Sequence, residues 1–308
     1  MIPEKTAIFL LDDGLCQSLA AGRHNFLGKL RGVLDASGFT TEVRHDSVVE
    51  QMSARAAGAW TIMHMAPVLD DRSVTVRRVY HYPFWAIEQN HERWNWRVAR
   101  TGFDPDVVPR HRAERFYAFW GKRLFNGAVA DARRDGFLYV PLQGRLRVAR
   151  RFQSCSPINM LRTVCESTDK PIRASLHPRE VYDAKDRAAI SALLSRFAHL
   201  EITQEPMETL LAGCDAVVCE NSSVAFNGFF FCKPAILFAQ SDFHHIALRG
   251  DVENCAETLA QTEVHTPDYA GYVHWFWQRM SVNAGREDAE EKMRAALERA
   301  GWPMGSGP

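Results

Sequence analysis

The 308-residue sequence lacks the short signatures of several common enzyme classes. No GxGxxG follows the first predicted strand, which disfavours a dinucleotide oxidoreductase. No GxxxxGK[ST] is present, which excludes a P-loop nucleotidase. No GxSxG appears either, so an α/β-hydrolase is also disfavoured.

The sequence also lacks an excess of charge of either sign. There are 37 basic and 37 acidic residues, so the formal net charge at pH 7 is zero. We therefore expect no nucleic-acid partner, because general nucleic-acid binding needs a basic field. Basic residues still cluster locally, and form either a solvated face or the lining of an anionic site: Arg145, Arg147, Arg150 and Arg151.

Paired cysteines and long apolar runs are missing as well. The seven cysteines show no zinc-knuckle or CxxC spacing, and several lie inside apolar runs, a pattern typical of a reducing compartment. No signal-peptide pattern opens the chain, and no apolar run is long enough to cross a bilayer. We therefore expect a cytoplasmic protein, and leave open its peripheral association with the inner face of the membrane.

Buried strands alternate with helices at the start of the chain. The run 6–11 is apolar and of strand length, which is typical of a strand buried on both faces of a parallel sheet. The pattern then predicts a helix at 25–36, a strand at 40–44, a helix at 48–56 and strands at 60–65 and 74–80. This alternation predicts a doubly wound, Rossmann-like half.

Aromatic residues are concentrated from Phe84 and Trp85 to Phe125. They recur at helical spacing, so we predict helices that pack in a core or a helix–helix seam rather than a ligand-stacking platform.

A second series of strands and helices begins at 137–143. It comprises helices at 157–166, 185–197 and 207–211, strands at 172–176, 200–202 and 216–219, and final helices at 272–280 and 287–300. The polar stretch 131–136 separates the two series. We therefore predict an α/β protein of two Rossmann-like domains that face a cleft, residues 1–134 and 135–308.

One polar turn lies between two buried segments of the second half. It follows the predicted strand 216–219, precedes a short apolar helix, and consists of Glu220, Asn221, Ser222 and Ser223. At a helix start, hydroxyls and free backbone N–H groups favour an anion. Serine and asparagine are also preferred capping residues, so a purely structural cap is the alternative.

Another polar turn, His177-Pro178-Arg179-Glu180, directly follows the predicted strand 172–176. Pro178 disfavours helix at His177, which places the imidazole at the carboxyl edge of the sheet, where open α/β sheets bind ligands. His177 and Arg179 are therefore candidate phosphate donors, with an ordinary surface loop as the alternative. The two turns together predict a phosphate or nucleotide site.

Three short elements resemble those of a known family. They are Tyr139-Val140-Pro141-Leu142-Gln143, His177-Pro178, and the segment 220–226 followed by Lys233-Pro234. Together they resemble the capsule polysaccharide biosynthesis family of Kdo transferases, and the His-Pro and Ser-Ser elements are similar to those of bacterial GT-B sialyltransferases. The resemblance covers residues 137–240. It implies a GT-B-like fold and a donor that is a CMP-activated ulosonic acid.

The resemblance also implies roles for individual residues. His177, Ser222 and Ser223 would hold the donor phosphate, and Glu220 would bond the ribose or base. In the sialyltransferases a carboxylate–carboxylate–glycine element carries the general base, and Asp12-Asp13-Gly14 matches it. Such a carboxylate deprotonates the acceptor while fixed donors hold the departing CMP, with no metal or cofactor needed. Turn chemistry is the alternative for these aspartates.

The chain departs from the Kdo transferases after Gln143. Those enzymes usually continue with a carboxylate, whereas Gln143 is followed by Gly144, Arg145 and no acid up to Ala149. We hypothesise that Gln143 lies at the substrate and that Arg145 and Arg147 bind the sugar-acid carboxylate through bidentate hydrogen bonds.

These observations predict a metal-independent glycosyltransferase. It would move a CMP-linked ulosonic acid such as Kdo onto a surface polysaccharide or glycolipid acceptor, with the aromatic helices shaping the acceptor side. One alternative is a non-catalytic carbohydrate- or nucleotide-binding protein of capsule assembly, which the missing acid favours. The other is a GT-B enzyme with a UDP- or CDP-linked donor.

Overall fold

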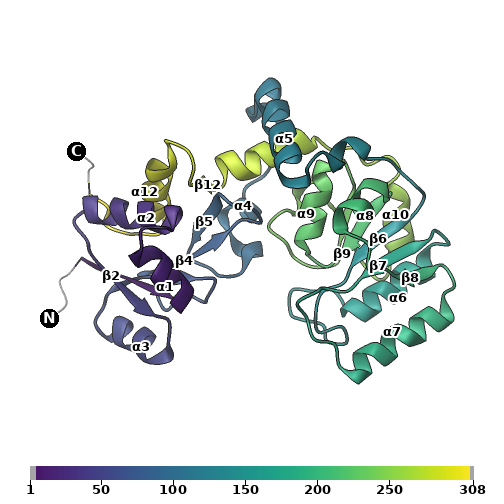
Figure 1. Ribbon diagram of the computed structural model, residues 1–308, viewed down its shortest axis with the longest axis horizontal. Helices are drawn as coiled ribbons and strands as arrows, with labels where there is room; N and C mark the ends of the chain where they lie inside the picture. The colour runs from purple at the N-terminus through teal and green to yellow at the C-terminus, as the bar shows by residue number, and fades with distance from the viewer. Residues whose placement is uncertain (1–4, 306–308) are drawn as a thin grey trace. The chain divides into compact units, whose positions relative to one another are not determined.

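The computed structural model describes residues 5–305, which form two compact units. Unit 1 contains the chain up to Thr101 and from Phe276 onward, and unit 2 contains Gly102–Trp275 (Figure 1). Each unit has its own six-stranded sheet.

The sheet of unit 1 has the order β12-β5-β4-β3-β1-β2. Its four strands from β4 to β2 are parallel, and at one edge β5 pairs antiparallel with β4 and β12 pairs antiparallel with β5. The strands are β1 Thr6–Leu11, β2 Thr40–His45, β3 Trp60–His64, β4 Ser73–Arg78, β5 Phe84–Glu88 and β12 Val282–Asn283. Every residue of β1 is buried, as the continuous apolar run predicts.

The helices of unit 1 cover this sheet. They are α1 Asp13–Ala20, α2 Asn25–Ala36, α3 Val48–Ala56, α4 Arg97–Arg100 and α12 Ala289–Arg299, with a 3₁₀ turn at Arg93–Asn95 and a π-helical turn at Trp275–Arg279. Phe26 of α2 stacks on Trp85 of β5 with ring centroids 4.5 Å apart. The last helix, α12, packs on α2 although the two are far apart in the sequence (Figure 1).

The sheet of unit 2 has the order β11-β10-β9-β6-β7-β8 and is parallel throughout. Its strands are β6 Leu138–Pro141, β7 Ile172–Ser175, β8 Leu200–Ile202, β9 Ala216–Cys219, β10 Ala235–Leu237 and β11 Leu248–Arg249. Its helices are α5 Arg110–Phe125, α6 Pro157–Ser167, α7 Ala184–Arg196, α8 Met207–Gly213, α9 Ser223–Phe230, α10 Cys255–Gln261 and α11 Tyr269–His274. Short 3₁₀ turns lie at Pro105–Val107, Ala128–Asp131 and His244–Ile246.

The prediction of helix at Phe84 and Trp85 is wrong, because this segment forms β5. Residues 84–87 are all buried, so both faces of the strand are covered, and its edges pair antiparallel with β4 and β12. A short apolar run of this kind fits a buried strand and a buried helix equally well by periodicity.

The division into units also differs from the predicted 1–134 and 135–308. The helix α5 belongs to unit 2, because Tyr117 donates its hydroxyl to the Phe229 carbonyl at 2.5 Å and stacks on Phe230. The C-terminal segment belongs to unit 1, because Val282 pairs with Trp85 across β12 and β5. Polar residues at 131–136 therefore mark a loop within unit 2 rather than a domain boundary.

Across residues 5–305, the structure contains no helix with the length and hydropathy needed to span a membrane.

Candidate functional site

The two predicted polar turns of unit 2 lie at the carboxyl edge of its sheet. The strand β6 sits between β9 and β7, with Pro141 opposite Ser175 in the β6–β7 register. The turns that follow these three strands, at 142–144, 176–180 and 220–223, therefore leave the sheet side by side. This is the edge at which open α/β sheets bind ligands.

Hydrogen bonds from Asn221 join three of the turns at this edge. Its backbone N–H donates to Oε1 of Gln143 at 3.5 Å, and its side-chain Nδ2 donates to the carbonyl of Gln240 at 2.9 Å. The N–H of Ala239 also donates to the Glu220 carbonyl at 3.2 Å. The turns after β6, β9 and β10 are therefore held in one arrangement rather than as separate loops.

The helix α9 presents its first turn at this edge. Ser222 is the N-cap, and its hydroxyl accepts from the N–H of Val224 at 3.3 Å. Ser223 is exposed, whereas residues 225–230 are all buried. Ser222 therefore caps α9, and its contact with a phosphate stays a prediction. The same geometry turns the positive end of the helix dipole toward solvent at Ser223.

His177 is held by its own turn. Its backbone N–H donates to the hydroxyl of Tyr182 at 2.9 Å, and its Nδ1 accepts from the N–H of Arg179 at 3.3 Å. Because Nδ1 is an acceptor, the neutral ring carries its proton on Nε2. His177 thus has a donor at Nε2, while the side chain of Arg179 is exposed beside it.

Glu180 supplies a carboxylate to the Gln143 turn that the sequence around Gln143 lacks. A Cβ added to Gly144 would lie 2.1 Å from Oε2 of Glu180, so this side chain rests against the Gly144 backbone. The contact joins the turns after β6 and β7. The sequence analysis missed this contact because it sought an acid only in the residues directly after Gln143. The neighbouring positions of β6 and β7 were the signal that could have revealed it.

Arg145 and Arg147 differ in their surroundings. Arg147 donates to Oδ1 of Asp186 and to Oδ2 of Asp183, each at 2.9 Å, and so braces the capping box of α7. Arg145 is exposed and has a left-handed backbone with φ of 59°. Arg145 therefore remains the better candidate for a sugar-acid carboxylate, because the carboxylates of α7 already occupy the guanidinium of Arg147.

Glu220 is buried beneath the polar turns, with 1% of its surface exposed. Neither carboxylate oxygen has a hydrogen bond of ordinary geometry among the described residues, and the same holds for Nε and Nη2 of the neighbouring Arg150. Burial raises the pKa of Glu220 to about 8, against the opposite influence of Arg150 and of the Gln153 side chain. The predicted contact of Glu220 with ribose or base stays a prediction.

This burial predicts a pH-dependent stability. Between the ordinary pKa of 4.5 and about 8, the unfolded chain ionises Glu220 while the folded chain keeps its proton, so the free energy of unfolding falls as pH rises. Glu220→Gln should therefore raise the unfolding free energy at pH 8 by about 1–3 kcal/mol and change it little at pH 5. Urea unfolding at the two pH values measures this, with the exposed Glu253→Gln as control. An equal effect at both pH values would contradict the burial argument.

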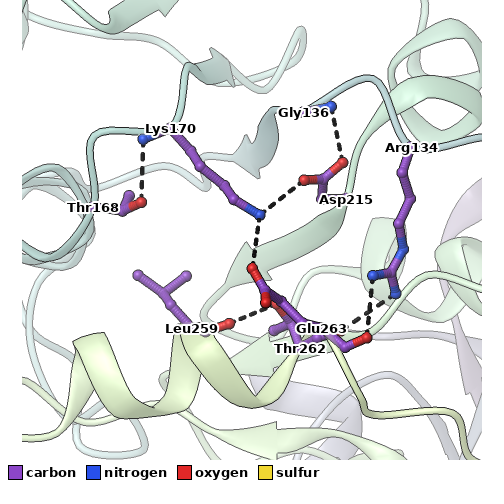
Figure 2. Close-up of polar contacts among 8 residues, drawn as sticks. All are labelled: Arg134, Gly136, Thr168, Lys170, Asp215, Leu259, Thr262 and Glu263. Carbon is purple, nitrogen blue, oxygen red and sulfur yellow. Dashed lines mark hydrogen bonds and ion pairs between the residues drawn. The ribbon is translucent and has the colours of Figure 1, made fainter.

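At the opposite, amino edge of the same sheet, the charged side chains pair with groups of unit 2 itself (Figure 2). Lys170 pairs with Asp215 at 3.0 Å and with Glu263 at 3.4 Å, and Asp215 also accepts from the N–H of Gly136 at 3.0 Å. Arg134 donates to the carbonyls of Thr262 and Glu263. Lys170, Asp215 and Arg134 at the amino edge thus have internal partners, whereas Glu220 and Arg150 at the carboxyl edge have side-chain atoms without a hydrogen bond of ordinary geometry.

Asp12 and Asp13 lie at the carboxyl edge of the sheet of unit 1, directly after β1. Asp12 is the N-cap of α1 and accepts from the N–H of Leu15 at 2.9 Å. Asp13 pairs with Nδ1 of His45 at 2.8 Å. Both side chains are exposed, at 63% and 79%, so both carboxylates are accessible from solvent.

The sequence analysis missed two histidines of unit 1: His64, which lies near Asp12, and His24, whose charge influences His64. Nδ1 of His64 lies 3.9 Å from Oδ2 of Asp12, too long for a hydrogen bond but within strong electrostatic reach. Burial lowers the pKa of His64, while the Asp12 carboxylate raises it. His24 caps α2 and packs edge-on against Trp85. The signal was the position of His64 at the end of a strand that neighbours β1.

Within residues 5–305, no group of three His, Cys, Asp or Glu side chains is placed to hold a metal ion.

Two Rossmann-like α/β units, each built on a largely parallel sheet, define the GT-B fold. Among solved structures, the chain is similar to the KpsC β-Kdo 2,7 transferase of Thermosulfurimonas dismutans. The TM-score is 0.56 at 12% identity, covering 96% of this chain and 99% of that chain. The predicted fold class is confirmed, and so is the resemblance in fold to a capsule Kdo transferase.

Other solved structures match with lower scores. The wall teichoic acid polymerase TagF (H444N variant) gives a TM-score of 0.32 at 11% identity, over 97% of this chain and 90% of that chain. WaaG, a glycosyltransferase of lipopolysaccharide biosynthesis, gives 0.36 at 10% identity, over 94% and 98%. No protein-family model and no curated protein matches the sequence.

Proposed function

We propose that this chain is a glycosyltransferase that uses a nucleotide-activated sugar, with a CMP-linked ulosonic acid such as Kdo as donor and a surface polysaccharide or glycolipid as acceptor. One observation supports the proposal most strongly. Three polar turns at the carboxyl edge of unit 2, after β6, β9 and β10, are joined through Asn221 and carry the α9 N-terminus, and His177 follows β7 at the same edge of the sheet. That arrangement suits a phosphate that leaves with its nucleotide.

In this proposal unit 2 binds the donor. The first turn of α9, with Ser222 and Ser223, receives the phosphate, because backbone N–H groups and the helix dipole favour an anion there. His177 donates from Nε2, and Arg179 adds a positive charge. These groups stabilise the negative charge that gathers on the phosphate as the glycosidic C–O bond breaks. Fixed donors of this kind need no metal.

Unit 1 would supply the base. An aspartate carboxylate takes the proton of the acceptor hydroxyl, the hydroxyl oxygen bonds to the anomeric carbon of the donor sugar, and CMP leaves with the bonding electrons. We favour Asp12 over Asp13, because the bond from Leu15 fixes its orientation while Asp13 is committed to His45.

Calorimetric titration with CMP, UDP, GDP and AMP tests the donor site. We expect selective binding of CMP, and we expect His177→Ala and Ser222→Ala each to weaken it by about tenfold, the usual cost of one hydrogen bond to a charged group. Ser47→Ala, which removes the equivalent N-cap of α3, and His199→Ala, before β8 at the amino edge, are the matched controls.

The titration also separates the alternatives. Preference for UDP would indicate a different donor class, and no binding of any nucleotide would refute the glycosyltransferase proposal. Selective CMP binding without release of CMP from CMP-Kdo would favour the non-catalytic carbohydrate- or nucleotide-binding protein. The missing acid after Gln143 favours that outcome, and the carboxylate of Glu180 against Gly144 favours the enzyme.

A further inference from the structure

The helix α5 carries a basic face that the proposed reaction does not use. Its 16 residues include five arginines and lysines and a single acid, Glu114, which pairs with Arg110 at 2.8 Å. Arg112, Arg115, Phe119 and Lys122 follow one another at spacings of three, four and three residues, which places them on one side of the helix. All four side chains are exposed.

The opposite side of α5 anchors the helix to unit 2. Trp120 and Phe125 are buried, and Gly121 lies against Phe230 and Val129. Tyr117 stacks on Phe230 with ring centroids 5.2 Å apart. The helix lies at the periphery of this unit, in the teal segment of Figure 1. These apolar contacts fix the orientation of α5, so its basic side chains face solvent.

The charges on this face have no internal partner. Within residues 5–305, Arg112, Arg115 and Lys122 form neither an ion pair nor a side-chain hydrogen bond. Phe119 lies between them with 57% of its surface exposed, and its ring meets the Trp120 ring edge-on with centroids 5.4 Å apart. Arg123, which lies over the Trp120 ring, extends the basic face at its C-terminal end.

We infer that the basic face of α5 docks on an anionic lipid bilayer. Lysine and arginine side chains on one side of a helix attract acidic headgroups, and an aromatic side chain among them enters the headgroup region. A soluble polyanion would satisfy the charges but would leave Phe119 exposed to water. The bilayer accounts for both features, so it is the partner that this face fits. The inference is independent of the proposed transfer reaction.

Co-sedimentation with vesicles tests this docking. The full-length protein should bind vesicles of phosphatidylcholine and phosphatidylglycerol in equal parts, bind pure phosphatidylcholine vesicles far less, and lose affinity as salt rises. Arg115→Gln/Lys122→Gln should weaken binding by about 25-fold, roughly fivefold for each charge removed. Phe119→Ser should weaken binding at high salt as well as at low salt, because its contribution is apolar.

The matched control is Lys185→Gln/Arg187→Gln, which removes two exposed positive charges from α7 of the same unit. It should bind like the unaltered protein. The inference fails if anionic vesicles are not bound, if both vesicle types bind equally, or if the two double variants behave alike. It also fails if the protein ignores vesicles but is retained on dextran sulfate through Arg115 and Lys122, which would assign the face to a soluble polyanion.

Discussion

Asp12→Asn is expected to lower the rate of sugar transfer by about 10²- to 10⁴-fold, the usual contribution of a positioned general base. Asparagine caps helices as well as aspartate does, so α1 and its bond from Leu15 should persist. The amide cannot accept the acceptor's proton, so the loss should fall on kcat. The measurement is release of CMP from CMP-Kdo with the acceptor that supports the fastest turnover, together with calorimetric CMP binding, which should not change.

Asp13→Asn is the matched variant, because it alters the neighbouring carboxylate and leaves the cap intact. We expect it to lose less than tenfold, since Asp13 pairs with His45. A full rate in Asp12→Asn with a large loss in Asp13→Asn would transfer the role of base to Asp13. Full rates in both variants would show that neither aspartate of this turn is the general base.

Lys233→Ala is expected to lower the free energy of unfolding by about 3–5 kcal/mol. This lysine is 2% exposed, and its ammonium donates to the carbonyl of Arg133 and, at 3.2 Å, to that of Ala212. The substitution removes the ammonium donor from the carbonyls of Arg133 and Ala212, of which the second still accepts from the Arg133 N–H at 2.8 Å, and it opens a cavity around the missing side chain. Urea unfolding followed by circular dichroism measures the change.

Lys233→Met separates the two contributions, because methionine fills much of the volume but donates no hydrogen bond. It should recover part of the loss and leave the cost of the missing ammonium hydrogen bonds, about 1–3 kcal/mol. The exposed Lys185→Ala is the control for loss of a surface lysine. A change below 1 kcal/mol for Lys233→Ala would show that water or a local shift satisfies these carbonyls.

Most elements of the fold were predictable because local and tertiary preferences agree. The helices α2 and α3 span the predicted ranges, with His24 and Ser47 as caps before each first turn. The strand β12 was missed because its two residues carry no pattern of their own. Its position depends on pairing with β5, far earlier in the chain. The same pairing brings the C-terminal segment into unit 1, so the observed units differ from the predicted division after residue 134.

The part of the candidate site that depends only on local sequence was predictable. Both polar turns follow parallel strands, so their common edge required no knowledge of strand order. The contacts between turns did require it. Glu180 reaches Gly144 only because β7 neighbours β6, and His64 reaches Asp12 only because β3 neighbours β1. Arg147 likewise finds its partners on α7, whose position no pattern around Arg147 predicts.

The connectivity of the two units sets the order in which they can be completed on the ribosome. Unit 2 is one continuous stretch inserted into unit 1, and unit 1 closes with β12 and α12 from the end of the chain. A nascent chain therefore exposes the edge of β5 and the apolar face of α2 until all of unit 2 has been translated. Unit 2 has all of its strands before then, so it is positioned to fold first, and unit 1 can reach its native structure only after β12 and α12 have been translated.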